Sequence, residues 1–105
     1  MTMAMIGHVI MWAFRVKPGS EWEFERIYGP DGDWERLMGQ AEGYMDTQLL
    51  RDIVEAGRYV TIDSWSTIAA YEEFMADFAA EYEALDGKCE SLTEEEESLG
   101  TFSLA

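Results

Sequence analysis

The chain has 105 residues, which is the size of one domain, and 48% of them are apolar, too many for a disordered protein. Its formal net charge of −15 argues against nucleic acid and anionic membranes as partners, because both require a basic surface. The single cysteine, Cys89, excludes an intrachain disulfide and any multi-cysteine metal site. No basic leader precedes Arg15 and the apolar opening is too short to span a bilayer, so we expect a cytoplasmic protein with a flexible extension at residues 1–4.

The first half of the chain predicts a strand, two helices and a second strand. Residues 8–16 form a strand that is apolar on both faces. Ser20 and Glu23 have the spacing of a capping box, which predicts a helix that buries Phe24, Ile27 and Tyr28. A turn at residues 29–32 precedes a short helix capped by Asp33, and an extended stretch follows at residues 44–51. The apolar side chains of the short helix share one face: Trp34, Leu37 and Met38.

The second half of the chain predicts a strand, a long helix, a short acidic helix and a last strand. Residues 58–65 are rich in β-branched and aromatic side chains, and the short link before them predicts an antiparallel hairpin with residues 44–51. Ser66 or Thr67 caps a helix over residues 68–85, with Gly87 just past its end. The capping-box spacing of Thr93 and Glu96 predicts a short helix over residues 93–98, and residues 101–104 alternate as a strand.

This order of elements predicts an α+β fold of the ferredoxin-like, split βαβ type, with a four-stranded antiparallel sheet and the main helices on one face. The first strand nevertheless has apolar residues on its other face, at Val9, Met11 and Ala13. An uncovered apolar face marks an association surface, because burying about 400 Å² of it is worth on the order of 10 kcal/mol before association costs. We therefore expect a homodimer formed sheet to sheet.

Several segments resemble the antibiotic biosynthesis monooxygenase-like (ABM) domains over most of residues 5–105. The similar segments, in chain order, are Phe14-Arg15-Val16-Lys17-Pro18-Gly19, Glu23-Phe24-Glu25, Leu49-Leu50-Arg51-Asp52 and Arg58-Tyr59-Val60-Thr61-Ile62-Asp63-Ser64-Trp65, followed by Ala70 and Phe74. The resemblance implies a dimeric α/β barrel in which two sheets face each other. It also implies a range of activities, from cofactor-free oxidation of aromatic polyketides or quinols with O₂ to haem degradation.

The resemblance disfavours haem degradation for this chain. Haem-degrading relatives use an Asn on the first strand, a Trp near the third strand and a His on the following helix. This chain has no Asn, and its helix over residues 68–85 has no His, although Trp65 is suitably placed.

Three side chains are candidates for acid–base catalysis. His8 is the only histidine and has an unperturbed pKa near neutrality, so it is a candidate base, although a single histidine at a strand start is also common without a function. If the hairpin pairs symmetrically about its link, Asp46 lies opposite Asp63 and Tyr44 opposite Trp65. Two facing carboxylates would repel, and one of them would then keep a raised pKa; a register shifted by one residue would separate them.

Aromatic side chains near the end of the third strand are candidates for a substrate pocket: Trp12, Trp65, Tyr71 and Phe74. The alternative is that they form only core and dimer interface. The sequence contains no glycine-rich fingerprint for a flavin or nicotinamide and no metal-ligand pattern, so no cofactor or metal is expected.

The leading functional hypothesis is a small cofactor-independent monooxygenase that oxidises an aromatic or quinol-like molecule with O₂. His8, Asp46 or Asp63 would supply the base, and the aromatic side chains would form the walls. The alternative is a non-catalytic, ligand-binding or stress-associated homodimer on the same scaffold.

Overall fold

Four antiparallel strands form one sheet in the computed structural model, which describes residues 5–105. The extension expected at residues 1–4 lies outside the described residues. The strand order is β2-β3-β1-β4, which is the ferredoxin-like order and confirms the predicted fold class. The strands are β1 (His8–Val16), β2 (Tyr44–Arg51), β3 (Arg58–Trp65) and β4 (Thr93–Phe102).

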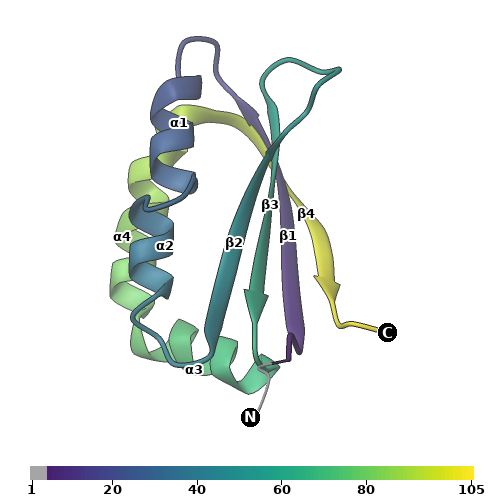
Figure 1. Ribbon diagram of the computed structural model, residues 1–105. Coiled ribbons are helices and arrows are strands. Elements are labelled where there is room, and N and C mark those ends of the chain that lie inside the picture. Colours follow the sequence, from purple (N-terminus) through teal and green to yellow (C-terminus); the bar gives the residue numbers. More distant parts are fainter. Residues whose placement is uncertain (1–4) are drawn as a thin grey trace.

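The helices all lie on one face of this sheet, and the other face is open (Figure 1). In chain order they are α1 (Glu21–Tyr28), α2 (Asp33–Met38), α3 (Ile68–Asp77) and α4 (Ala79–Cys89), followed by the short 3₁₀ turn η1 (Glu90–Leu92). Helix α4 runs beside α1 and α2, whereas α3 crosses the end of the sheet near the end of β3 (Figure 1).

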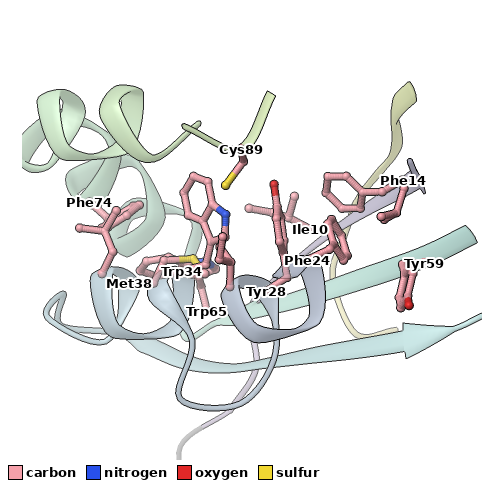
Figure 2. Close-up of a cluster of buried hydrophobic side chains, with 13 residues drawn as sticks. Ile10, Phe14, Phe24, Tyr28, Trp34, Met38, Tyr59, Trp65, Phe74 and Cys89 are labelled. Atoms are coloured by element: carbon pink, nitrogen blue, oxygen red, sulfur yellow. The ribbon is translucent and has the colours of Figure 1, made fainter. Parts of the chain in front are cut away.

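The core lies between the helix layer and the sheet, as the apolar stripes predict. All three stripe residues of α1 are buried, and so are the three of α2. They pack against the helix-facing residues of β1 and β3, which include Ile10, Phe14, Val16, Tyr59 and Trp65. Figure 2 shows this cluster, in which the rings of Phe24 and Tyr28 stack with centroids 4.1 Å apart.

Helices α1 and α3 begin where the sequence predicts, α2 begins one residue earlier, and only one cap forms as expected. Thr67 accepts a hydrogen bond from the backbone N–H of Ala70 and caps α3. Ser20 precedes α1 without a side-chain cap, so the capping box with Glu23 does not form; Glu23 instead pairs with Arg26. Gly32, not Asp33, is the cap position of α2.

The predicted helix over residues 68–85 is two helices. Phe78, with φ −114° and ψ 25°, ends α3 and redirects the chain into α4. Gly87 lies inside α4, which continues to Cys89. The two segments pack against different partners, α3 against β3 and α4 against α2, and one straight helix cannot contact both.

The acidic helix predicted over residues 93–98 is wrong, because these residues begin β4. The antiparallel ladder with β1 spans Val9 to Val16 and provides backbone partners along most of β4. This pairing outweighs the helical preference of a glutamate run, since secondary structure of short segments follows tertiary context. The last strand is therefore longer than the four residues expected, and its glutamates alternate between the two sheet faces.

The open face of the sheet carries both apolar and charged side chains. Val9, Met11 and Ala13 of β1 share it with the residues paired to them, which are Phe102, Ile62 and Val60, and with Leu50 of β2, which pairs with Val60. Leu50 and Phe102 are each 48% exposed. Arg15 and Glu55 form an ion pair of 2.6 Å near one end of this face. The apolar surface expected from the first strand is therefore present.

Candidate functional site

A cavity of about 150 Å³ lies between the helix-facing side of the sheet and the helix layer. All four strands contribute to its sheet wall, with Ile10, Trp12, Phe14, Thr47, Thr61, Asp63 and Glu96. All four helices contribute to the opposite wall, with Tyr28, Trp34, Met38, Tyr71, Phe74, Tyr82 and Asp86. Seven of these fourteen side chains are aromatic, and the volume is that of an apolar cavity that admits one benzene-sized ring.

Asp63 is the acidic side chain in the cavity wall whose pKa is brought close to neutrality. Its carboxyl lies on the helix-facing side of β3, opposite Ile10 of β1 and Thr47 of β2. Burial first, and then the negative charge of Asp46, raise the pKa of Asp63 from 3.8 to about 6. The carboxyl therefore changes protonation close to neutral pH, where a general acid or base is most effective.

A hydrogen-bonded chain orients this carboxyl. The Thr47 hydroxyl donates to Oδ1 of Asp63 at 2.7 Å, and Thr47 Oγ1 lies 2.6 Å from the Tyr44 hydroxyl. The bond from Thr47 favours the ionised carboxylate and partly offsets the effect of burial on its pKa. Since Thr47 donates its single proton to Asp63, the Tyr44 hydroxyl donates to Thr47.

A bulge in β2 creates this arrangement. Tyr44 pairs with Trp65, as symmetric pairing predicts, but the register shifts before Asp46, which pairs with Ser64. Thr47 consequently lies opposite Asp63, and Asp46 points to the exposed, open face of the sheet. The predicted Asp46–Asp63 pairing is wrong because the extra residue of the bulge moves every later side chain of β2 to the other face.

The cavity is acidic as well as aromatic. Asp86 of α4 and Glu96 of β4 join Asp63 in its walls, and no lysine, arginine or histidine is among the described residues that line it. The pKa of Glu96 is raised, first by burial and then by the charge of Asp86. The pKa of Tyr82 is raised to about 12 by burial and by neighbouring acidic groups. The arginines pair with carboxylates elsewhere, as Arg51 does with Glu25 at 2.8 Å.

The structure brings four of the seven predicted site residues to the cavity: Trp12, Asp63, Tyr71 and Phe74. Trp65 is fully buried behind the wall, where its ring contacts those of Tyr71 and Phe74 at centroid distances of 5.6 and 5.2 Å. His8 is 8% exposed and its ring lies 5.4 Å from Tyr71, but it does not line the cavity.

The sequence analysis missed three polar side chains of the site: Thr47, Asp86 and Glu96. Thr47 has no distinctive pattern around it, and the bulge that turns it inward carries no sequence signal that we recognised. The sequence predicts a helix at Glu96. In the structure Glu96 lies on a strand, and its pairing with Phe14 places it on the helix-facing side of the sheet. Asp86 lies four residues after Tyr82, and this spacing places both side chains on one face of a helix. The sequence therefore contained a signal for Asp86.

Two further features bear on what the site can hold. Trp34 lines the cavity, and its buried indole nitrogen has no hydrogen-bond partner among residues 5–105. No group of three His, Cys, Asp or Glu side chains suited to hold a metal ion occurs in this part of the chain. No helix within it is long and apolar enough to cross a membrane.

Comparison with known proteins identifies the family. The chain is similar to PA3566 from Pseudomonas aeruginosa, with 14% identity, 99% of each chain covered and a TM-score of 0.69. SnoaB, a cofactor-independent oxygenase from Streptomyces nogalater, is 21% identical, with 95% of this chain and 94% of that chain covered and a TM-score of 0.64. A Bordetella bronchiseptica protein, provisionally assigned as an antibiotic biosynthesis monooxygenase, is 25% identical, with 94% of this chain and 98% of that chain covered and a TM-score of 0.68.

The search of curated proteins found no match. A family model described as antibiotic biosynthesis monooxygenase matches residues 7–85, which include β1 to β3, the bulge and most of the helix layer. The chain therefore belongs to the antibiotic biosynthesis monooxygenase (ABM) family, as its segments around the first and third strands indicated.

Proposed function

We propose that the protein is a cofactor-independent monooxygenase that oxidises an aromatic, quinol-like molecule with O₂, and that Asp63 is its general base. The observation that carries this proposal is a carboxyl group with a pKa of about 6 in the wall of an aromatic cavity. Membership of the ABM family and the fold shared with SnoaB, a cofactor-independent oxygenase, support it.

The proposed reaction begins with proton transfer. The Asp63 carboxylate accepts a proton from a hydroxyl of the bound quinol, and Thr47 holds the carboxylate in place. The resulting phenolate is electron-rich and transfers one electron to O₂, which gives a substrate radical and superoxide. These combine at a ring carbon to a peroxide anion, which takes back the proton from Asp63, and the resulting hydroperoxide loses water. One oxygen atom of O₂ then remains in the product quinone and the other leaves as water, so a hydroquinone and O₂ yield a hydroxyquinone and H₂O.

The aromatic walls have a defined part in this scheme. Trp12, Tyr71 and Phe74 contact the ring faces of a planar substrate and keep water away from the phenolate. Exclusion of water strengthens the electrostatic effect of every nearby charge.

The experiment is O₂ uptake with a panel of single-ring quinols, using the wild type, Asp63→Asn and His8→Ala. We expect turnover by the wild type with an acidic limb near pH 6 in kcat/KM, because Asp63 must be ionised to act as base. Asp63→Asn should lower kcat by a factor of about 10² or more, the usual worth of a general base, while His8→Ala retains most of the activity. Saturable binding without O₂ uptake by any substrate would favour the non-catalytic alternative.

We also propose that the protein is a homodimer formed through the open sheet face. Met11, Ile62 and Val60 lie at the centre of that face, on the two inner strands, where solvent would otherwise contact apolar side chains. A two-fold axis through the face pairs each apolar side chain with the same region of a second copy, which buries both. The charged residues at its ends, including Arg15 and Arg58, would then lie at the polar rim.

A further inference from the structure

The cavity that we propose as the oxidation site combines three properties that together select a particular ligand charge. It accommodates one ring, its walls are half aromatic, and its charged groups are all acidic: Asp63, Asp86 and Glu96. We infer that the natural ligand is a single-ring phenol or quinol that carries a protonated amine, with the hydroxyl at Asp63 and the ammonium beside Asp86 and Glu96. This inference rests on the proposed function and adds the class of substrate.

The placement of the three carboxyl groups separates two roles. Asp63 lies on β3, in the inner part of the sheet, and burial is the largest influence on its pKa. Glu96 lies on the edge strand β4 and is exposed, and Asp86 lies on α4 close enough for its charge to raise the pKa of Glu96. The cavity therefore has a half-buried carboxyl at one end, where Asp63 pairs with Ile10, and a pair of carboxyls toward the other end, where Glu96 pairs with Phe14.

Aromatic side chains connect these two ends. Trp12, Tyr71 and Tyr82 present π systems in the cavity wall, and such faces attract a cation held over them. Two neighbouring carboxylates repel each other, and a bound ammonium removes that repulsion. A carboxylate ligand would increase the repulsion, so the same groups select against anionic aromatic compounds.

A hydroxyl on the ligand follows from the chemistry proposed for Asp63. The carboxylate needs a donor on the ligand from which it can accept a proton, and a phenol or quinol hydroxyl is such a donor. An amine without a ring oxygen would leave the Asp63 carboxyl without a proton to accept.

Three probes with the same phenol ring and different chain ends test the inference by titration calorimetry. They are 4-(2-aminoethyl)phenol, the uncharged 4-ethylphenol and 3-(4-hydroxyphenyl)propanoate. At low salt and pH 7.5 we expect the ammonium to bind about tenfold more tightly than the uncharged phenol, and the propanoate more weakly than both. Glu96→Gln and Asp86→Asn should each reduce the advantage of the ammonium about threefold or more, with little effect on 4-ethylphenol.

Glu97→Gln is the matched control, because this substitution removes the same charge from the protein. Glu97 is the next residue on β4 and faces the open side of the sheet. If Glu97→Gln reduced the advantage as much as Glu96→Gln, the preference would come from the overall charge of −15, and the inference would be overturned.

The outcome for charge selection is separate from the outcome for catalysis. Equal binding of all three probes overturns the amine preference and leaves the oxidation of neutral quinols to be judged by O₂ uptake. Selective binding of the ammonium together with no O₂ uptake by any quinol, including 2-(2,5-dihydroxyphenyl)ethylamine, supports the amine site and overturns the proposed oxygenase.

Discussion

Replacing Asp63 by Asn should make the protein more stable and less active at the same time. The substitution keeps the shape of the side chain and an oxygen that accepts the hydrogen bond from Thr47. It removes only the negative charge that the cavity wall disfavours. Because the same charge is the proposed base, the stability and the activity of this variant are expected to change in opposite directions.

The magnitude follows from the pKa of this carboxyl. Its value in the folded protein is about 6, above its ordinary value of 3.8, so the folded state binds a proton more tightly than the unfolded state. The contribution of this carboxyl to the free energy of unfolding is therefore fully present below about pH 4 and is lost as the pH rises through about 6. At about 1.4 kcal/mol for each tenfold difference in proton affinity, the loss reaches about 3 kcal/mol at pH 7.5.

Urea unfolding at pH 4 and at pH 7.5, at one protein concentration, measures this effect. The free energy of unfolding of Asp63→Asn should exceed that of the wild type by about 3 kcal/mol at pH 7.5 and by less than about 1 kcal/mol at pH 4. Subtracting the wild-type value at each pH cancels the contributions of the other carboxyl groups.

Asp46→Asn is the control for removing a charge from the same hairpin, because Asp46 is exposed on the opposite face of the sheet. Its free energy of unfolding should stay within about 0.5 kcal/mol of the wild type. If Asp63→Asn were equally or less stable than the wild type at pH 7.5, the argument that burial disfavours the Asp63 charge would be refuted, and with it the reason for choosing Asp63 as the base.

Three further predictions concern the site's hydrogen bonds, the assembly and the core. Thr47→Val removes the hydrogen bond that favours ionised Asp63, so the acidic limb of kcat/KM should move to higher pH; an unchanged limb would exclude this role. Sedimentation at micromolar concentration should give twice the chain mass, and Met11→Asp on the open face should give the monomer mass; a wild-type monomer would contradict the dimer. Tyr59→Phe removes a hydrogen bond to the Glu25 carboxylate and should lower the free energy of unfolding in urea by about 1–3 kcal/mol, whereas Tyr71→Phe, which removes a hydroxyl without a hydrogen-bond partner among residues 5–105, should lower it less.

The elements that the sequence predicted correctly are those whose apolar pattern is local. The stripe of Phe24, Ile27 and Tyr28 has helical spacing, and residues 58–65 have the composition of a strand. The local sequence of each segment therefore favours the same secondary structure that the segment adopts in the fold. The order of these segments was enough for the ferredoxin-like topology, because few arrangements place two helices on one face of four strands. Four of the fourteen side chains that line the cavity follow from this, namely Trp12, Asp63, Tyr71 and Phe74.

Only the tertiary structure decided the features that depend on a partner segment. Residues 93–98 have helical signals, but β1 offers them a ladder of backbone hydrogen bonds, and β4 forms instead. The bulge in β2 exchanges Asp46 for Thr47 beside Asp63, because strand side chains alternate and one extra residue reverses the face of all that follow. The sequence by itself therefore determined the fold and named Asp63 as one candidate base, whereas pairing between strands decided which neighbours that carboxyl has.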